Sequence, residues 1–301
     1  MTTQAKRQSV TPRIGKPSGV WHSLRKVPLL ITLCFITLLL LVVAALFAPV
    51  IAPFDPNAQQ LLARLKPPAF MAGGVPEHPL GTDQLGRDML SRIIFAFRPS
   101  LGIAAIGTVI GLVLGTVIGL VSGLTEGWLD NAIMMLVDVQ LAIPFILLAL
   151  MAVTVFGTGM IVLMVVVGFA GWETYARLTR GQVLATKNLP YIEASQALGA
   201  SRAYLALRHV LPNIASPLLV LATLNFSGIV LLESALSFLG LGVQPPTASL
   251  GSMVGAGRDY MASAWWVVAA PSFLLFLLTM TTSLIGDWLR DSLDARISDA
   301  A

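Results

Sequence analysis

Three carboxylates stand inside long apolar stretches of the chain, at Asp138, Glu173 and Glu233. An ionisable side chain within a membrane span costs about 2.5–3.5 kcal/mol on insertion scales, so such groups are usually paired or functional. They could line a water-filled path or its gate. They could instead pair with Arg177, Asn225 or a nearby helix end, and for Glu173 the arginines one and two turns further on favour pairing.

The other polar residues offer little catalytic chemistry. The histidines His22, His78 and His209 all lie outside the apolar stretches, which disfavours an enzyme active site within the membrane. His78 and Asp83 could hold a metal, but two groups without a cysteine or a second histidine nearby make a weak set. Cys34 is the only cysteine, so no intramolecular disulfide is possible. The chain has no GxxxxGK[S/T] loop with which to cradle ATP phosphates in the usual manner.

The composition places these residues in a membrane protein. Hydrophobic residues make up 56% of the chain and charged residues 11%, whereas soluble domains average about 45–50% and about 25%. Windows of about 20 apolar residues, which are long enough to cross a bilayer, predict six spans. They are helices, because no alternating polar pattern of a barrel is present. The spans lie near Leu29–Ile51, Leu101–Val121, Ala132–Phe156, Met160–Ala176, Ile214–Leu239 and Trp265–Ile285.

Basic residues set the predicted orientation. Lys and Arg accumulate in cytoplasmic segments, and here they gather before the first span, in the loop after the fourth and at the C-terminal end. We therefore expect both termini in the cytoplasm. A secretory signal peptide is an alternative for the first stretch, which is however longer than the 7–15 residues typical of such signals.

The expected organisation follows from these spans. It consists of a cytoplasmic tail over 1–28, a first transmembrane helix over 29–51, an extracytoplasmic segment over 52–98, a five-helix core over 99–290 that contains a cytoplasmic loop over 179–213, and a cytoplasmic tail over 291–301.

The extracytoplasmic segment is rich in proline and ends in apolar residues at helical spacing. Met89–Phe95 therefore predict an amphipathic helix that lies along the outer membrane face. The alternative is a solvated loop whose helix caps come from Thr82 and Asp83.

The second predicted span carries a stripe of glycines spaced four apart. In lipid, small residues at this spacing let helices approach closely and gain van der Waals contact. The stripe predicts a packing seam, either within this chain or against a second transmembrane subunit. Its members are Gly107, Gly111, Gly115, Gly119 and Gly123.

The cytoplasmic loop contains two short helices. Pro190 ends the preceding helix, because a residue before proline avoids the αR conformation. Residues 191–198 form the first short helix, with Ile192, Ala197 and Leu198 on its apolar side. Gly199 can adopt positive φ and turn the chain, and Ser201 caps a second short helix that ends at residue 207.

The two helices make a compact knob, residues 191–208, whose small side chains permit close approach by another protein. Pro212 marks the entry into the next span. The alternative is a helical hairpin that lies on lipid headgroups through Arg202 and Arg208.

This loop resembles the coupling segment of bacterial ABC importer permeases, whose pattern is Glu-Ala-Ala, three residues, Gly, nine residues and Ile-x-Leu-Pro. The chain matches at Glu193, Ala194, Gly199, Leu211 and Pro212, and it departs at Ser195 and His209. Serine is still small enough for docking. Other segments are similar to the C-type permeases of dipeptide, oligopeptide and nickel importers, namely His78–Asp83, Leu85–Asp88, Trp172 with Tyr175–Arg177, Glu233–Gly242 and Gly286–Asp291.

The resemblance implies an all-α, multi-pass permease of the type I ABC importer fold in the bacterial cytoplasmic membrane. It implies a second, homologous permease subunit, two ABC ATPase subunits and an extracytoplasmic substrate-binding protein as partners, and no nucleic acid. ATP and Mg²⁺ would be bound by the ATPase subunits, with no cofactor in this chain. The docking residues would be Glu193, Ala194, Ser195, Gly199, Ala200, Arg202, Leu211 and Pro212.

The substrate expected for such a permease is a di- or oligopeptide, moved by alternating access. Nickel chelates, glutathione or another small solute are alternatives with the same architecture. A different class, an ion-coupled secondary transporter, could use Asp138, Glu173 and Glu233 as relays but would not need the knob. Within the importer, Asp138 and Glu233 are the candidates for the pathway or its gate.

Overall fold

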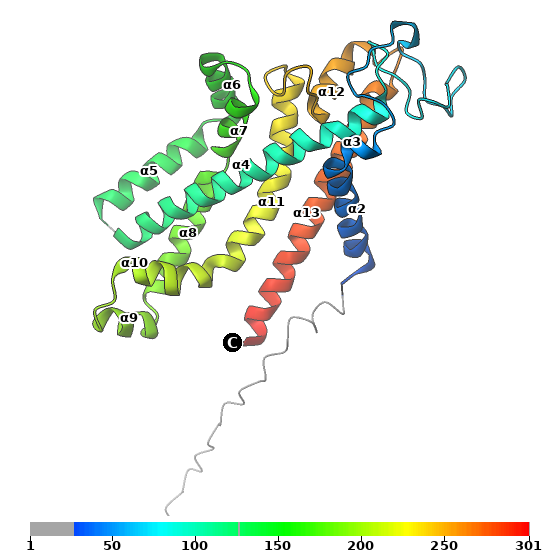
Figure 1. The fold of residues 1–301 in the computed structure, drawn as a ribbon. Coiled ribbons are helices and arrows are strands. Elements are labelled where there is room, and N and C mark those ends of the chain that lie inside the picture. The colour runs from blue at the N-terminus through cyan, green and yellow to red at the C-terminus, as the bar shows by residue number, and fades with distance from the viewer. Residues whose placement is uncertain (1–26, 126, 301) are drawn as a thin grey trace, which may run out of the picture.

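The computed structural model describes residues 27–125 and 127–300 (Figure 1). The basic tail over residues 1–26, Glu126 and Ala301 lie outside the described residues. The predicted cytoplasmic tail over 1–28 therefore falls almost wholly outside them.

All regular secondary structure in the described residues is helical, apart from an isolated bridge between Thr82 and Asp88. In chain order these are α2 (Leu29–Leu46), α3 (Ala48–Ile51), the 3₁₀ turn η2 (Leu61–Ala63), α4 (Met89–Thr125), α5 (Trp128–Ala142), α6 (Phe145–Phe156), α7 (Met160–Gly168), α8 (Trp172–Lys187), α9 (Pro190–Ala197), α10 (Arg202–Leu205), the π-helical turn η3 (Ala206–Val210), α11 (Leu211–Phe238), α12 (Leu250–Gly257), the 3₁₀ turn η4 (Arg258–Tyr260) and α13 (Trp266–Ala300). The all-α prediction is confirmed.

Within the described part of the chain, 5 helices are long and apolar enough to cross a membrane, or up to 6 if the bent pair α5–α6 is one span. The predicted third span is therefore not one straight helix, since α5 and α6 meet at 91°. Pro144, which begins the new segment, has no N–H to continue the ladder of α5, and Ile143 before it is extended at φ −97° and ψ 125°. In Figure 1 the pair runs from the end that carries α9 to the opposite end.

The knob and the C-terminus lie at one end of the bundle, and α3, α12 and the segment between α3 and α4 lie at the other (Figure 1). This arrangement agrees with an even number of crossings and with a cytoplasmic C-terminus. Helix α13 continues without a break to Ala300, so the predicted tail over 291–301 is helical as far as the structure describes it.

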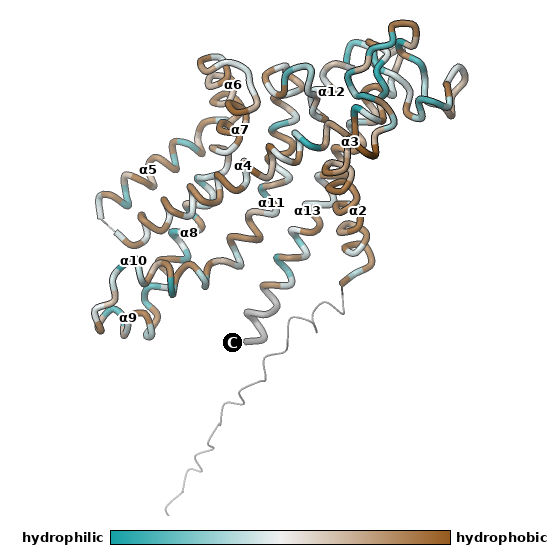
Figure 2. Tube along the Cα trace, viewed as in Figure 1, coloured by the Kyte–Doolittle hydropathy of each residue, from teal (hydrophilic) through white to brown (hydrophobic). Residues whose placement is uncertain are grey.

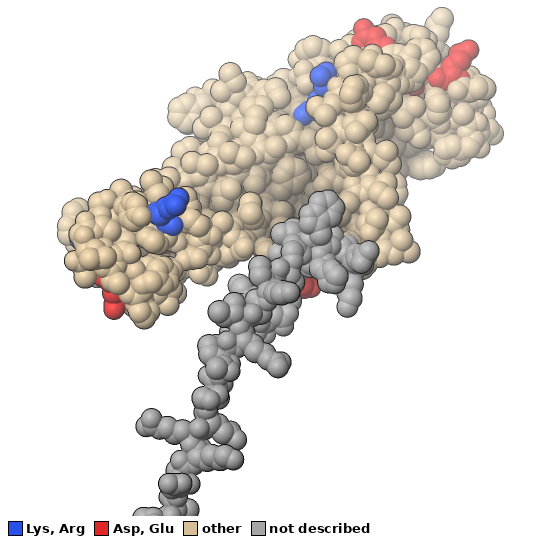
Figure 3. All heavy atoms as spheres, turned by 60° about the horizontal axis from the view of Figure 1, so that its bottom comes forward, with Lys and Arg blue, Asp and Glu red and all other residues tan. Residues whose placement is uncertain are grey.

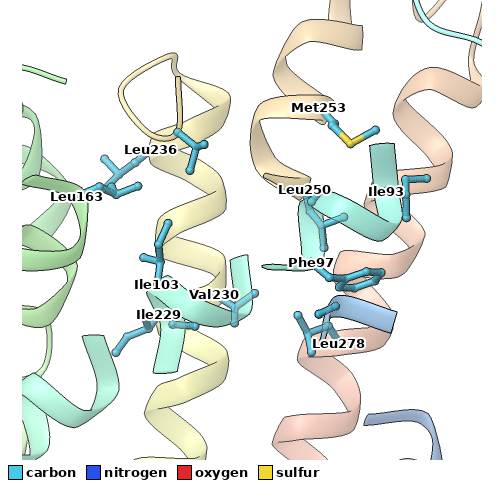
Figure 4. Packing of buried hydrophobic residues seen from close by; sticks show 14 of the residues in the cluster. Ile93, Phe97, Ile103, Leu163, Ile229, Val230, Leu236, Leu250, Met253 and Leu278 are labelled. Atoms are coloured by element: carbon cyan, nitrogen blue, oxygen red, sulfur yellow. The ribbon is translucent and has the colours of Figure 1, made fainter. Parts of the chain in front are cut away.

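The expected amphipathic helix over Met89–Phe95 is wrong, because these residues are the first turns of the 37-residue helix α4. Their apolar side chains face protein instead of the membrane surface. Met89, Ile93 and Phe97 are at most 3% exposed and join the core that includes Leu250 and Trp266. Figure 4 shows Ile93 and Phe97 pointing towards α12 and α13.

The main core lies between α4, α7, α11, α12 and α13, where Ile103, Leu163, Val230, Leu236 and Leu278 are almost completely buried (Figure 4). Hydrophobic residues run along most of the helices (Figure 2). Many of their large side chains are exposed, along α2, α5, α6 and α13. This distribution is the one expected of helices that face lipid.

The glycine stripe is a seam within the chain, between α4 and the pair α7–α8. A Cβ on Gly115 would lie 2.2 Å from the carbonyl oxygen of Trp172, and one on Gly119 would lie 2.5 Å from that of Ala176. A Cβ on Gly111 would lie 3.2 Å from the carbonyl oxygen of Ala170, whereas one on Gly107 or Gly123 would meet the side chain of Val167 or Val183, at 3.0 and 2.7 Å. Backbone therefore packs directly on backbone at Gly111, Gly115 and Gly119, and the two outer glycines make room for valine side chains.

A partly buried ion pair closes the seam at the end nearest the knob. Arg180 of α8 donates from Nε and Nη2 to the two carboxylate oxygens of Asp130 of α5, at 2.6 and 2.7 Å. Ser122 of α4 also donates to Asp130. Three helices thus meet on one carboxylate, and two parallel hydrogen bonds fix the direction of the arginine.

The segment between α3 and α4 is held by two buried aspartates. Asp83 accepts hydrogen bonds from the N–H groups of Leu85 and Arg87 and pairs with the Arg87 guanidinium at 2.7 Å. Asp88 accepts from the N–H of Ser91 at 2.7 Å and so caps α4. The cap predicted at Thr82 or Asp83 is therefore at Asp88.

The weak metal set of His78 and Asp83 is not assembled. His78 instead lies 2.9 Å from Asp88, through Nδ1 and Oδ1. No group of three potential metal ligands is found in residues 27–125 and 127–300.

Substitution of Gly115 by alanine should destabilise the protein, since the added Cβ must push the α8 backbone away, and such overpacking costs about 1–3 kcal/mol. Gly102→Ala in the same helix is the control, because a Cβ there meets no atom within 4 Å. We expect a lower apparent Tm in detergent for Gly115→Ala only. Equal Tm values for the two variants would show that close packing at the seam does not contribute to the stability of the protein.

Candidate functional site

The loop between α8 and α11 begins as the sequence predicts. Helix α8 ends at Lys187, Leu189 is extended at φ −75° and ψ 138°, and α9 starts with Pro190 in its first turn. Proline is favoured there because its missing N–H would be unpaired in any case.

Gly199 makes the turn after α9, with φ +90°. The N–H of Gly199 donates to the carbonyl of Gln196 at 2.9 Å, and that of Ala200 donates to Ser195 at 3.1 Å. This is the double hydrogen bond of a Schellman motif, in which the left-handed residue is usually glycine. A Cβ on Gly199 would meet no atom within 4 Å, so the backbone conformation is what requires glycine here.

Ser201 caps the next helix as predicted, accepting a hydrogen bond from the N–H of Tyr204 at 3.2 Å. The predicted end of that helix at residue 207 is wrong, because α10, η3 and α11 form one continuous helix over Arg202–Phe238. The N–H of Leu211 bonds to the carbonyl of Ala206, five residues back. This π-helical turn shifts the ladder just before Pro212, which has no N–H to donate.

The inner face of the loop packs on the bundle. Ile192, Leu205 and Val210 are at most 4% exposed, and they form a second core with Tyr175 and Val183 of α8. Ala197 and Leu198 were expected on this side, but both are exposed. Gly199 redirects the chain just beyond them, so the end of α9 turns away from the bundle.

The outer face of the knob carries large apolar side chains. Leu198 is 89% exposed, Leu207 64%, Tyr204 52% and Tyr191 44%. The knob projects from the end of the bundle (Figure 1). A group of exposed apolar residues in water marks an interaction surface more often than chance would suggest.

The predicted docking residues lie around this surface. Glu193, Ala194 and Arg202 are exposed, and Ser195 and Ala200 are half-buried. The Ser195 hydroxyl donates to the carbonyl of Tyr191 at 2.9 Å and so does not reach outwards. Leu211 is half-buried and Pro212 is exposed, in the first turn of α11.

An aromatic contact that the sequence analysis missed joins the two halves of the knob. The His209 ring lies between Tyr191 and Tyr204, with ring centroids 5.9 and 5.6 Å away. Asn213 also donates to the Tyr191 hydroxyl at 2.7 Å. The spacing of these residues gives no signal, because the turn at Gly199 brings them together.

Asp138 and Arg177 form an exposed ion pair between α5 and α8. Their side chains are 67% and 55% exposed. Glu173 lies in the first turn of α8 and does not pair with the arginines expected for it, because Arg177 pairs with Asp138 and Arg180 with Asp130. One oxygen of the Glu173 carboxyl is buried and has no hydrogen-bond partner.

Glu233 lies in the opposite environment, at 0% exposure in α11. In the part of the chain that the structure describes, its carboxyl accepts hydrogen bonds from the hydroxyls of Ser100, Ser234 and Ser237, of which Ser237 is closest at 2.7 Å. It therefore does not line an open path in this conformation. Charged side chains occupy only small parts of the face in Figure 3.

Comparison with known proteins gives the family. Residues 111–299 match the family of binding-protein-dependent transport system inner membrane components, and residues 18–68 match the N-terminal TM domain of oligopeptide transport permease C. A di/tripeptide transport system permease protein, DppC, of Pseudomonas aeruginosa is 44% identical over 88% of this chain and 87% of its own length. The dipeptide transport system permease protein DppC of Escherichia coli is 42% identical over 92% of both.

Among solved structures, the chain is similar in fold to the inward-facing MetNI methionine ABC transporter. The TM-score is 0.55 at 21% identity, over 68% of this chain and 97% of that chain. The helical bundle with a knob at one end thus has the type I importer fold. The chain belongs to the family of binding-protein-dependent transport system inner membrane components, the multi-pass permease subunits of ABC importers, whose ATP is hydrolysed by separate subunits.

Proposed function

We propose that this chain forms half of the translocation pathway of an ABC importer for di- or oligopeptides. In this proposal it pairs with a second, homologous permease, receives substrate from an extracytoplasmic binding protein, and is driven by two ATPase subunits that bind ATP and Mg²⁺. The observation that carries the proposal is the knob, which places apolar side chains on a rigid projection at the cytoplasmic end.

The knob is built to transmit force. Ser201, the Schellman turn at Gly199 and the His209 contact fix its shape from within, and Ile192 and Leu205 anchor it to α8. Leu198 and Leu207 are left for a partner. Closure of the ATPase subunits would displace the knob, and α11 would move with it, in the rigid-body manner of alternating access.

The ion pair of Asp138 and Arg177 supports a position for the pathway. Asp138 is ten residues from the start of α5, or about 15 Å along the helix, which is half of a hydrocarbon core of about 30 Å. Charges exposed at that depth are costly in lipid. We therefore place water or the second permease, and not lipid, on the face of α5 and α8 that carries this pair.

Relatives at 44% and 42% identity are named for di/tripeptide and dipeptide transport, which favours peptides as the substrate. Nickel chelates and glutathione remain the alternatives of the same architecture. Uptake of a radiolabelled dipeptide by the reconstituted importer tests this assignment. Uptake of a nickel chelate or of glutathione, with none of the dipeptide, would replace it.

The ion-coupled transporter finds little support in the geometry. A relay needs carboxyls that reach one another or water, whereas Asp138 is held by Arg177 and Glu233 is sealed among serines. An importer that still takes up peptide after loss of its ATPase subunits would favour this second class.

Substitution of Gly199 by proline should abolish transport while leaving the permease in the membrane. Proline fixes φ near −65°, whereas the turn needs φ +90°, so the knob loses its shape and the bundle does not. The measurement is ATP-driven dipeptide uptake in proteoliposomes, with the amount of permease set equal by immunoblot. Retained uptake would show that the loop does not couple the ATPase subunits to transport.

Substitution of Leu198 by glutamate should lower the amount of ATPase subunit that copurifies with the permease, and the uptake, by about tenfold or more. The reason is that a buried, unpaired charge at a contact costs several kcal/mol. Leu62→Glu is the control, since Leu62 is 99% exposed in the segment between α3 and α4 at the far end of the molecule. Equal copurification for the two variants would exclude Leu198 from the docking surface.

Substitution of Asp138 by asparagine should reduce uptake about tenfold, because Arg177 is left without its partner on the pathway face. The double variant Asp138→Arg with Arg177→Asp should recover part of the loss. Arg258→Gln breaks an equally exposed pair with Asp259, at 3.2 Å in η4, and should change uptake less than twofold. Wild-type uptake by Asp138→Asn would place the pathway elsewhere.

A further inference from the structure

Glu233 is completely buried, and serine hydroxyls surround its carboxyl group. Ser237 donates to Oε1 at 2.7 Å, and Ser100 and Ser234 each lie 3.4 Å from Oε2. No Lys, Arg or His forms an ion pair with it among the described residues. A buried carboxyl without a cation depends on such hydrogen bonds, because its desolvation is otherwise uncompensated.

The same serines tie down three helices. Ser100 belongs to α4 and accepts the N–H of Leu250, the first residue of α12, at 3.2 Å. Ser237 belongs to α11 and accepts the N–H of Val243, in the loop before α12, at 3.3 Å. The carboxyl of Glu233 therefore orients hydroxyls that in turn hold the start of α12 and its preceding loop. We call Glu233, Ser100, Ser234 and Ser237 the serine clamp.

The backbones around the clamp are in direct contact. A Cβ on Gly251 of α12 would lie 2.4 Å from the Cα of Ser234, and one on Gly242 would lie 1.9 Å from the Ser237 hydroxyl. A Cβ on Gly255 would lie 2.8 Å from the carbonyl oxygen of Phe238. The hairpin of α11 and α12 thus has no slack, and a movement of the end of α11 must carry α12 with it.

The clamp and the knob lie at opposite ends of one helix. The continuous segment Arg202–Phe238 starts inside the knob and ends one turn after Glu233. From Leu205 to Glu233 the helical rise is about 40 Å. Figure 1 shows this segment running from α10 to the end that carries α12.

The loop held by the clamp lines a cavity at the outer end. Pro246, Thr247 and Ala248 line it together with Phe54, Arg92 and Arg98, and its volume is about 770 Å³. This cavity faces the side from which substrate enters under the proposed function. A change in the position of α11 would alter its shape through the clamped loop.

We propose that the serine clamp couples the knob to the outer mouth of the pathway, with Glu233 as its positioning residue. Displacement of the knob moves α11, and the clamp makes the outer end of α4, the start of α12 and the loop before it follow as one body. Without the clamp the ATPase cycle continues while the outer mouth no longer responds. This inference rests on the proposed function.

The test compares ATP hydrolysis with uptake in the full complex of both permeases and both ATPase subunits, reconstituted in proteoliposomes. The binding protein loaded with a radiolabelled dipeptide starts the reaction. For Glu233→Leu we expect stimulated ATP hydrolysis within twofold of the wild type and at least a tenfold drop in dipeptide taken up per ATP. Glu233→Gln retains an acceptor oxygen for Ser237 and should recover most of this ratio.

Two milder variants keep the test decisive if Glu233→Leu does not assemble. Ser237→Ala and Ser100→Ala remove one hydroxyl each and should lower uptake per ATP about threefold. Ser227→Ala is the matched control, since Ser227 is a buried serine of the same helix whose hydroxyl contacts Thr282 of α13 at 2.6 Å, away from the clamp. This variant should keep the wild-type ratio.

The clamp is overturned if the wild type couples uptake to ATP and Ser237→Ala, Ser100→Ala and any assembled Glu233→Leu do so equally well. It is also overturned if Ser227→Ala lowers the ratio as much as Ser237→Ala, because loss of any buried hydroxyl would then suffice. Failure of the proposed function has a different signature, in which the wild type itself shows no ATP-driven dipeptide uptake.

Discussion

The arrangement of this molecule depends on the direct contact of backbones between α4 and α8. Helices in lipid gain no hydrophobic free energy from each other, so they hold together through close packing and polar contacts. Glycines at every fourth position let the carbonyl groups of Trp172 and Ala176 approach α4 more closely than any side chain would allow. This seam fixes the position of α8. Helix α8 carries Arg177 and Arg180, which pair with two aspartates of α5, and it leads into the knob.

In the proposed mechanism, the knob, α11 and the hairpin of α11 and α12 transmit movement from the cytoplasmic end of the molecule to its outer end. Its cytoplasmic end is shaped by local backbone chemistry at Gly199 and Ser201. Its middle is one helix that passes Pro212 by way of a π-helical turn. Its outer end is held by the carboxyl of Glu233. Each part is held by different contacts, and together they would let the permease respond to a separate ATPase subunit.

The exposed polar and apolar groups indicate that the chain is part of a larger assembly. An ion pair such as Asp138 with Arg177 would be costly against lipid, and Leu198 and Leu207 would be costly in water. Both conflicts disappear if a second permease or the pathway covers the first surface and an ATPase subunit covers the other. The family membership of the chain agrees with that division of labour.

The sequence by itself determined the features that depend on composition and local geometry. The apolar stretches predict the membrane helices. Pro190 and Gly199 predict the boundaries of α9, and Ser201 predicts the cap of α10. Only the tertiary structure decided which charged groups meet. Arg177 pairs with Asp138 although Glu173 is nearer in the sequence, and the carboxyl of Glu233 binds the hydroxyl of Ser100 from another helix. Sequence spacing does not predict these contacts, because they join segments distant in the chain. The extension of α4 back to Met89 was also a tertiary outcome. The helical pattern of a sequence shows which positions are apolar, but it does not show whether lipid or another helix will cover them.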